Sequence, residues 1–322
     1  MTRPTILVTR RLPDPVQARL AERYEVRFSD DDAPMDAAGL SDALCRFDAL
    51  VPTITDRITA EMIAQPGRRA RMLANFGAGL DHINLNAARE HGLPVSNTPD
   101  ALTDATAELA ILLMLMASRR AGEGERELRG GQWTGWRPTH LIGQGLGGRT
   151  LGLIGFGRIA QATARRARAL GMNIAFYNRS TPPEAVTAAL EARRMASPEA
   201  LVACADIVSL HVPGGADTHH LVNAELLAAM RPGAILVNTA RGTVVDEAAL
   251  ADALDGGTIA AAALDVYEGE PRVHPGLLAH SRSVLLPHLG SATIETRTAM
   301  GMQAIANLDA FFAGREPPNR VA

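Results

Sequence analysis

A glycine-rich turn between an apolar run and a helical pattern constrains the fold of this chain more than any other feature. Residues 151–154 have the composition of a buried strand, and residues 155–160 read G-F-G-R-I-A, which fits the pattern G-x-G-x-x-G/A. The first glycine permits a tight turn, the second lets the backbone approach a pyrophosphate, and the small Ala160 lets the next helix pack on the strand. A second predicted strand at residues 174–177 completes a βαβ unit. The segment therefore predicts a parallel sheet with a dinucleotide at the amino end of the helix.

Strand and helix patterns alternate along the whole chain, which predicts a fold of the α/β class. Before the glycine-rich turn, short apolar runs predict strands at residues 6–8, 49–51 and 72–75. After it, six strands separated by helical patterns are expected between residues 151 and 286. Such alternation is typical of doubly wound sheets, in which helices cover both faces of a parallel sheet.

The length of 322 residues suits two domains, because one domain usually holds about 100–200 residues. We expect a substrate domain with a flavodoxin-like sheet at residues 1–99 and 289–322, and a Rossmann domain that binds the dinucleotide at residues 100–288. The last helix, at residues 293–312, is expected to return to the first domain.

The composition excludes several classes of protein. The formal net charge of −3 gives no basis for nucleic-acid binding, and the longest apolar stretch, residues 109–117, is too short to cross a membrane. The chain contains no lysine, which rules out lysine Schiff-base chemistry and a P-loop. Cys45 and Cys204 have no cysteine or histidine partner at the spacing of metal ligands, so we expect free thiols, no metal site and a cytoplasmic protein.

The loop after the second strand of the βαβ unit indicates which dinucleotide binds. Enzymes that prefer NAD usually place an acidic residue there, which binds the ribose hydroxyl. This loop contains Asn178, Arg179 and Ser180, and no acidic residue lies between Met172 and Pro183. Arg179 can pair with a 2′-phosphate, and Ser180 can donate a hydrogen bond to it. We predict a preference for NADP(H), with NAD(H) also possible; the alternative is that Arg179 is an ordinary solvated residue.

Three successive strand ends of the second domain carry residues suited to hydride transfer, namely Arg241, Glu270 and His288. Ligands of doubly wound sheets bind at the carboxyl ends of strands, so we expect these side chains to converge. A histidine can protonate the alkoxide that forms when a ketone accepts a hydride, and a carboxylate can stabilise the imidazolium. An arginine can bind a substrate carboxylate and polarise the keto oxygen. Each residue alone is more often structural, but together they predict a catalytic group.

These strand ends and the glycine-rich turn resemble those of the D-isomer-specific 2-hydroxyacid dehydrogenases, and the resemblance covers essentially the whole chain. It includes residues 75–83 (NFGAGLDHI) in the first domain and residues 209–213 (SLHVP) in the second. By that resemblance, His288 is the general acid/base, Glu270 is its partner, and Arg241 binds the substrate carboxylate and activates the carbonyl.

The resemblance also implies which residues bind the cofactor and the substrate. Asp265 is expected to hold the nicotinamide carboxamide, and Pro213 and Thr239 are expected to line the cofactor cleft. Backbone amides of Phe76 and the two glycines that follow it are expected to cradle the substrate carboxylate. The implied cofactor set is Thr103, Gly155, Phe156, Gly157, Arg158, Ile159, Asn178, Arg179, Ser180, His211, Val212, Pro213, Thr239, Ala240, Asp265 and Gly290. The implied substrate set is Phe76, Gly77, Ala78, Gly79, Arg241 and His288.

Within the family, the chain is most similar to NADP-dependent glyoxylate/hydroxypyruvate reductases, in residues 133–138 (WTGWRP) and in the Asn-Arg-Ser loop. We therefore expect NAD(P)H-dependent reduction of glyoxylate or hydroxypyruvate to the D-2-hydroxy acid. Residues 51–55 lack the arginine usual in phosphoglycerate dehydrogenases, and Glu270 stands where formate dehydrogenases have glutamine. The alternatives are a larger 2-keto acid or phosphoglycerate as substrate, phosphite oxidation, and a dinucleotide-sensing corepressor that binds partners without turnover.

An apolar helix from Thr103 or Asp104 to about Arg119 is followed by a glycine-rich arm at residues 122–148. The helix is apolar on nearly all sides, so we expect it to be deeply buried. By the resemblance, this helix and the arm are expected to join the Rossmann domains of a homodimer, and Trp136 is a candidate to reach the neighbour's substrate site. The alternative is that the tryptophans only anchor the arm.

Overall fold

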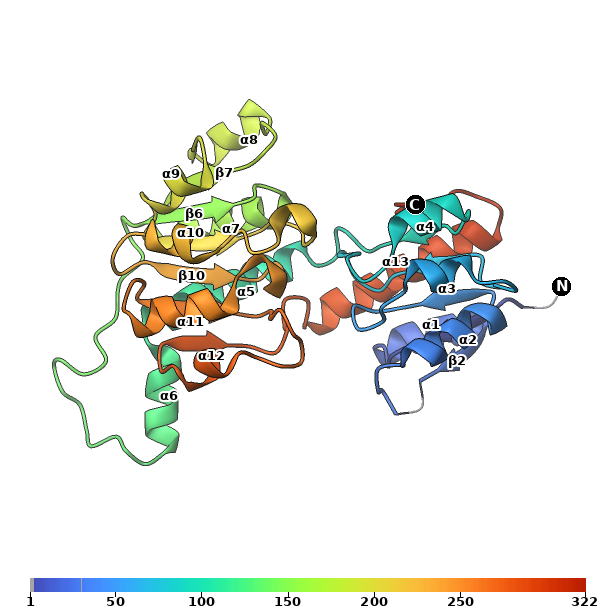
Figure 1. Ribbon diagram of the computed structural model, residues 1–322, viewed down its shortest axis with the longest axis horizontal. Helices are drawn as coiled ribbons and strands as arrows, with labels where there is room; N and C mark the ends of the chain where they lie inside the picture. The colour runs from blue at the N-terminus through green and yellow to red at the C-terminus, as the bar shows by residue number, and fades with distance from the viewer. Residues whose placement is uncertain (1–2, 30) are drawn as a thin grey trace. The chain divides into compact units, whose positions relative to one another are not determined.

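The computed structural model describes residues 3–29 and 31–322, which form two compact units (Figure 1). Unit 1 comprises residues 1–102 and 291–322, and unit 2 comprises residues 103–290. These boundaries fall within three residues of the expected ones. No helix of the described residues is long and apolar enough to cross a membrane.

Unit 1 is built on a parallel sheet of short strands. The strands are β1 (Thr5–Val8), β2 (Glu25–Phe28), β3 (Ala49–Val51), β4 (Leu73–Ala74) and β5 (Val95–Ser96). In the described residues their order is β2-β1-β3-β4-β5, all parallel, which is the predicted flavodoxin-like order. The sequence predicted neither β2, an edge strand with no fully buried residue, nor β5, which has only two residues.

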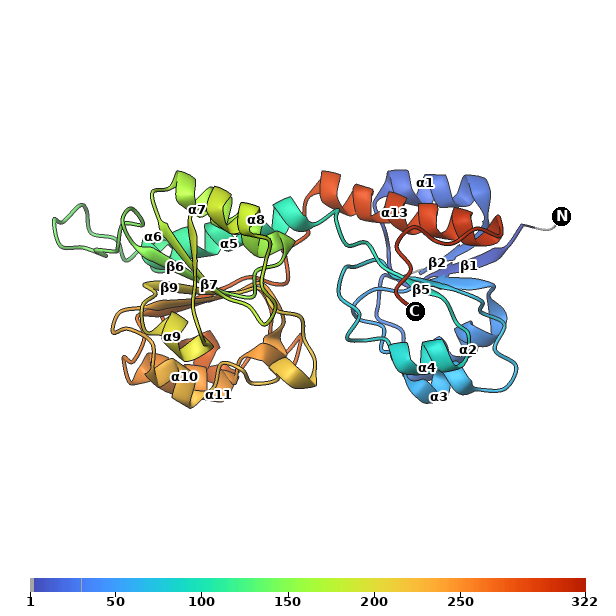
Figure 2. The same cartoon turned by 90° about the horizontal axis from the view of Figure 1, so that it is seen from above.

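Helices cover both faces of this sheet. They are α1 (Asp14–Arg23), α2 (Ala37–Arg46), α3 (Ala60–Ala64), α4 (Leu85–Glu90) and α13 (Ile294–Phe312). Figure 2 shows α1 and α13 on one face and α2, α3 and α4 on the other. The hydroxyl of Thr293 accepts a hydrogen bond from the Thr296 amide and so caps α13, which returns to unit 1 as expected. A Cβ at Gly301 would lie 2.4 Å from the Val16 side chain, so only glycine lets α13 approach α1 this closely.

Unit 2 contains a larger parallel sheet. Its strands are β6 (Thr150–Ile154), β7 (Asn173–Tyr177), β8 (Ala192–Arg194), β9 (Ile207–Leu210), β10 (Ile235–Asn238), β11 (Ala261–Leu264) and β12 (Ser283–Leu285). The order within the described part of the chain is β12-β11-β10-β9-β6-β7-β8, the Rossmann order with one further strand. Six of these strands were predicted; β8 was missed because it is short, lies at the sheet edge and has no buried residue.

The helices of unit 2 again lie on both faces. They are α5 (Thr103–Ser118), α6 (Ala121–Arg129), α7 (Arg158–Ala169), α8 (Glu184–Ala189), α9 (Pro198–Val202), α10 (Ala224–Ala228), α11 (Glu247–Asp255) and α12 (Pro275–Ala279), with 3-10 turns η1 (Ala216–Thr218) and η2 (Gly242–Val244). Figure 2 places α5 and α7 on one face and α9, α10 and α11 on the other. Two apolar clusters, one on each face, fill the space between the helices and the sheet.

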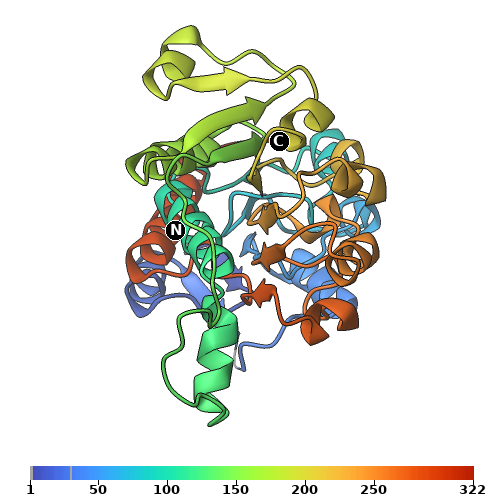
Figure 3. The same cartoon turned by 90° about the vertical axis from the view of Figure 1, so that its left-hand side faces the viewer.

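Two expectations about the segment before β6 are wrong. Helix α5 buries Leu113 and Met114, but Leu112 and Leu115 remain 45% and 37% exposed, so the helix has one solvent-facing apolar stripe. The segment predicted as an extended arm begins with α6, whose charged residues give it a helical pattern without any buried position. Figure 3 shows α6 and the chain that follows it standing off the sheet of unit 2.

The strand order of unit 2 determines where a ligand can bind. The chain runs outward from β6 in both directions, to β7 on one side and to β9 on the other. The loops after β6 and β9 therefore flank the topological switch point, which is where doubly wound sheets bind their ligands. The His211 amide donates to the Ile154 carbonyl oxygen at 2.8 Å, and this bond joins the two loops.

Candidate active site

The glycine-rich loop joins β6 to α7 beside the end of β9. Gly155 has a φ of +90°, and a Cβ there would lie 2.4 Å from the carbonyl oxygen of His211, so this position requires glycine. A Cβ at Gly157, by contrast, would meet no atom of the described chain within 4 Å. This open backbone precedes the 12 residues of α7, and the amino end of such a helix attracts an anion. The loop therefore fits the pyrophosphate of a dinucleotide.

The loop after β7 contains the residues predicted to select the dinucleotide. The Phe156 amide donates to Asn178 Oδ1 at 3.1 Å, and Asn178 Nδ2 donates to Ser180 Oγ at 3.0 Å, so Asn178 joins this loop to the glycine-rich loop. Arg179 donates to Asp217 Oδ2 at 2.9 Å, in a pair whose side chains are 73% and 79% exposed. Asp217 lies in η1, 38 residues further along the chain, so nothing in the loop itself indicates this partner of Arg179.

The ends of β9 and β10 supply further polar groups. Burial lowers the pKa of His211 to about 4, so the imidazole is neutral at neutral pH, and its Nε2 lies 2.9 Å from Ser209 Oγ. Thr239 Oγ1 is buried and has no hydrogen-bond partner in the part of the chain that the structure describes. A buried hydroxyl without a partner is costly, and a bound polar ligand would satisfy it. This position therefore also fits the predicted cofactor site.

His288 and Glu270 form a hydrogen-bonded pair at the carboxyl edge of the sheet. His288 Nδ1 lies 2.9 Å from Glu270 Oε2 and 3.2 Å from Oε1. His288 has a φ of +55°, a left-handed conformation that is uncommon for a residue with a side chain and often marks a functional site. Because Nδ1 is held by the carboxylate, Nε2 is the ring nitrogen that can exchange a proton with a substrate.

The charge of Glu270 is set by the groups around it. Burial alone would raise its pKa, but the groups around it, led by the hydrogen bond and charge of His288, together outweigh burial. The Tyr267 amide, which donates to Oε1 at 3.0 Å, and the positive charge of Arg241 act in the same direction. The pKa of Glu270 therefore lies below its ordinary value, and the carboxylate remains ionised at neutral pH. An ionised carboxylate on Nδ1 stabilises a protonated imidazole.

Asp265 holds the chain segment that carries His288. Its Oδ1 accepts a hydrogen bond from the Leu289 amide at 2.6 Å, its Oδ2 accepts one from the Gly290 amide at 2.8 Å, and its carbonyl accepts from the His288 amide at 2.9 Å. Burial raises the pKa of Asp265 to about 6, although the amides and the His288 charge oppose this rise. In this structure Asp265 is a positioning residue for His288, and its contact with a nicotinamide stays a prediction.

Arg241 is fixed by contacts of its own backbone. Asn238 Nδ2 donates to the Arg241 carbonyl oxygen at 2.9 Å. A Cβ at Gly242 would lie 1.8 Å from the carbonyl carbon of Tyr267, so the turn with Arg241 packs directly on the chain that leads to Glu270. Contact through a glycine thus couples the loops after β10 and β11. The charge of Arg241 acts on Glu270, which is hydrogen-bonded to His288, so the three residues lie near one another in unit 2; their catalytic roles stay a prediction.

The loop of residues 76–79 lies in unit 1. Asn75 is fully buried, and its Nδ2 donates to the carbonyl oxygens of Gly77 and Gly79 at 3.0 Å each. The Phe76 amide donates to the Pro52 carbonyl oxygen at 2.8 Å, so it is already used within the fold and does not suit the anion-binding role expected of it. The expected set of amides is therefore reduced to those that follow Phe76.

Several residues at these strand ends were not found from the sequence. Thr106 in α5 donates to the Gly290 carbonyl oxygen at 3.0 Å and so supports the His288 loop, and Asp217 binds Arg179. A third group, formed by His219, His220 and Glu268, comes from two loops. The common reason is distance along the chain: each contact joins residues at least 38 positions apart, and no local motif indicates them.

This arrangement defines a class of protein: a two-unit α/β dehydrogenase whose Rossmann sheet presents arginine, glutamate and histidine at successive strand ends. Residues 111–290 match the family described as D-isomer specific 2-hydroxyacid dehydrogenase, NAD binding domain. The chain belongs to this family of oxidoreductases.

Similar proteins span the full length of the chain. A glyoxylate reductase of Thermococcus litoralis is 39% identical over 99% of this chain and 97% of its own length. A glycerate dehydrogenase of Hyphomicrobium methylovorum is 35% identical over 98% of both chains. Among solved structures, an NADPH-dependent glyoxylate/hydroxypyruvate reductase of Sinorhizobium meliloti, in complex with NADP and malonate, is 37% identical with a TM-score of 0.87 over 100% of this chain and 97% of that one.

Proposed function

We propose that this protein reduces glyoxylate or hydroxypyruvate to the corresponding D-2-hydroxy acid with NAD(P)H. The observation that carries the proposal is the His288–Glu270 pair, with the charge of Arg241 acting on it, at the same sheet edge as the glycine-rich loop. The relatives described as glyoxylate reductase and glycerate dehydrogenase support the choice of a small 2-keto acid.

Each residue of this site has a distinct role in the proposed reaction. A bound nicotinamide supplies the hydride. His288 donates a proton from Nε2 to the carbonyl oxygen, and ionised Glu270 on Nδ1 stabilises the protonated ring before the transfer. Arg241 binds the substrate carboxylate and polarises the keto oxygen.

The test is the initial rate of NADPH and NADH oxidation with glyoxylate and with hydroxypyruvate as acceptors. We expect turnover with both acceptors, and a loss of about 10²- to 10⁴-fold in kcat for His288→Gln, because the variant lacks the proton donor. Turnover only with 2-keto acids that have longer side chains would contradict the substrate assignment and leave the mechanism in place. Equal rates for wild type and His288→Gln would contradict the mechanism.

We propose NADPH as the preferred cofactor. Arg179 can pair with a 2′-phosphate, and a second arginine, Arg194 in β8, donates to the Asn178 carbonyl oxygen at 3.1 Å in the same loop. The exposed pair between Arg179 and Asp217 does not oppose this assignment, because such pairs contribute about 0–1 kcal/mol and a phosphate can displace the carboxylate. The Sinorhizobium meliloti structure in complex with NADP supports the same preference.

Two substitutions separate the roles of the arginine and the aspartate. Arg179→Ala is expected to raise the KM for NADPH by about tenfold and to change the KM for NADH little, because it removes a phosphate-binding group. Asp217→Asn is expected to lower the KM for NADPH, because it removes a negative charge that competes for Arg179. Equal changes of both KM values in either variant would contradict the proposal.

We also propose that the protein is a homodimer joined through unit 2. The exposed apolar residues of this unit are concentrated on α5, α6 and the chain before β6, which is unusual for a surface that faces only water. These residues are Leu112, Leu115, Leu128, Trp133, Trp136 and Ile142. Trp136 is 83% exposed, which does not fit a residue that anchors the arm on its own subunit.

A further inference from the structure

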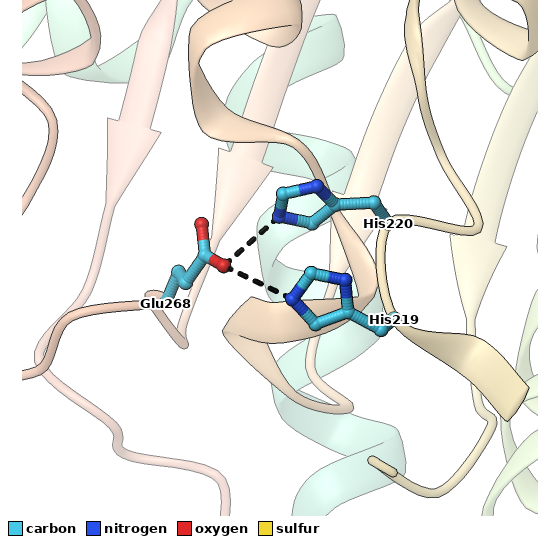
Figure 4. A group of neighbouring side chains, drawn as sticks. All are labelled: His219, His220 and Glu268. Carbon is cyan, nitrogen blue, oxygen red and sulfur yellow. Dashed lines mark hydrogen bonds and ion pairs between the residues drawn. The ribbon is translucent and has the colours of Figure 1, made fainter. Parts of the chain in front are cut away.

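His219, His220 and Glu268 form a cluster on unit 2 that the proposed reaction does not use. The two histidines directly follow η1 in the loop after β9, and Glu268 lies in the loop after β11. Both Nε2 atoms face the same carboxylate oxygen, Glu268 Oε1, at 2.9 Å from His220 and 3.5 Å from His219 (Figure 4). We propose that this cluster is a binding site for a divalent transition-metal ion such as Zn²⁺.

The donor set and its spacing support this assignment. Two imidazole nitrogens with one carboxylate oxygen are ligands that suit Zn²⁺, Ni²⁺ or Cu²⁺, whereas Mg²⁺ and Ca²⁺ prefer oxygen ligands. Ligands about 2.0–2.2 Å from a tetrahedral zinc ion lie about 3.3–3.5 Å from one another. The distances of 2.9 Å and 3.5 Å from Oε1 span that range, so only small side-chain movements would admit an ion.

The backbones that carry the three ligands are already held in place. The His220 amide donates to the Thr243 carbonyl oxygen at 2.9 Å, and the Glu268 amide donates to Glu247 Oε1 at 2.8 Å. Gly242, which follows Arg241, packs on the peptide between Tyr267 and Glu268. Both loops are therefore positioned without a metal, and binding would cost little ordering of the main chain.

The side chains leave room for an ion to enter. The imidazoles of His219 and His220 are 54% and 34% exposed, and Glu268 is 37% exposed. The two rings stack with centroids 4.0 Å apart and 25° between their planes, and both direct Nε2 towards Glu268 (Figure 4). Three protein ligands leave a coordination position for water or a small anion.

The cluster is distinct from the catalytic pair. Glu270, two residues after Glu268, is bound to His288, while Glu268 faces the other two histidines. The site therefore goes beyond the proposed function, since the reduction needs no ion at this cluster. The expectation of no metal site rested on the two cysteines alone, and the carboxylate that completes this cluster follows 48 residues after His220.

Titration of the full-length protein with ZnCl₂, followed by calorimetry, tests the proposal. The protein is prepared without a histidine tag and dialysed against a chelator that is then removed. We expect about one ion per chain, and an affinity that falls as the solution is acidified, because metal binding requires neutral imidazoles. His219→Gln and Glu268→Gln are each expected to weaken binding by about tenfold or more. Titration with CoCl₂ should give visible absorption bands from bound cobalt that both variants lose.

The matched control is His140→Gln. His140 Nε2 also lies near a carboxylate, 3.0 Å from Glu127 Oε2, but the described residues place no third ligand beside this pair. The control should bind zinc as wild type does, and circular dichroism should show that all the variants are folded. Absence of zinc binding in the wild type would overturn the proposal. Binding that survives in folded His219→Gln and Glu268→Gln but is lost in His288→Gln would also overturn it, because the ion would then sit at the catalytic pair.

Discussion

At the scale of single residues, the hydrogen-bond partners of the ionisable groups decide what those groups can do. Glu270 is a half-buried carboxylate whose pKa burial would raise, yet His288 and the other groups around it lower that pKa. Its contribution to stability is therefore present above the unfolded pKa and is lost as the pH falls through the folded pKa. A carboxylate that stays ionised can keep its partner imidazole oriented for proton transfer.

Glu270→Gln should lower the rate of reduction and change its dependence on pH. An amide keeps a hydrogen bond to His288 Nδ1 but removes the negative charge, so the protonated ring is less stable. We expect kcat for keto-acid reduction to fall by about tenfold or more, and its decline with rising pH to begin at lower pH. Rate profiles over a range of pH check this, and an unchanged profile with a lower kcat would assign Glu270 to structure alone.

Asp265 should affect stability in the opposite sense, because its folded pKa of about 6 lies above its ordinary value. The stability that this group contributes is fully present below the unfolded pKa of about 4 and is lost as the pH rises through about 6. Asp265→Asn removes this titration and one acceptor for the Leu289 and Gly290 amides. We expect the variant to be less stable than wild type at about pH 4, and the deficit to shrink towards about pH 7.5. Denaturant unfolding at both pH values measures the difference, and a constant deficit would contradict the assigned shift.

At the scale of elements, the hydrophobic pattern predicted the buried strands. It did not predict the edge strands or the solvent-facing side of α5. The strands β6, β9, β10 and β11 are mostly apolar and almost entirely buried, so composition alone identifies them. The strands β2 and β8 are edge strands with polar residues, and their pairing depends on neighbours far along the chain. Helix α5 was expected to be buried all round because an apolar pattern does not distinguish the residues that face the core from those that face solvent.

Gly242→Ala should disrupt the contact between the loops after β10 and β11. A methyl group there would collide with the Tyr267 backbone, which cannot move without shifting the chain that leads to Glu270. We expect a loss of stability of about 1–3 kcal/mol or more, together with a lower kcat. Gly145→Ala is the matched control, because a Cβ at that exposed glycine meets no described atom within 4 Å. Equal unfolding free energies for the two variants would contradict this prediction, because they would show that the two loops can move apart to accommodate the methyl group.

At the scale of the whole molecule, two sheets of known strand order place the functional residues in loops at strand ends. The sequence predicted Arg241, Glu270, His288 and the glycine-rich loop because a short motif or a strand end indicates each of them. It did not predict Asp217, since the acid beside Arg179 comes from the loop of a different strand. The strand order of the folded sheet decides which loops touch. Local sequence patterns therefore do not predict the contacts between these loops.

The proposed dimer makes a prediction about the exposed stripe of α5. Leu112→Glu combined with Leu115→Glu should keep the helix, because glutamate is a good helix former, and should place two charges in the proposed interface. We expect light scattering after gel filtration to show a dimer for wild type and a monomer for the double variant. Leu278→Glu is the control, because Leu278 on α12 is 63% exposed but lies outside the proposed interface. If the wild type is monomeric, or if the double variant and the control are equally dimeric, the stripe of α5 is not a dimer interface and this proposal is wrong. If the double variant alone dissociates and also loses activity, the dimer is needed for catalysis as well as for covering apolar surface.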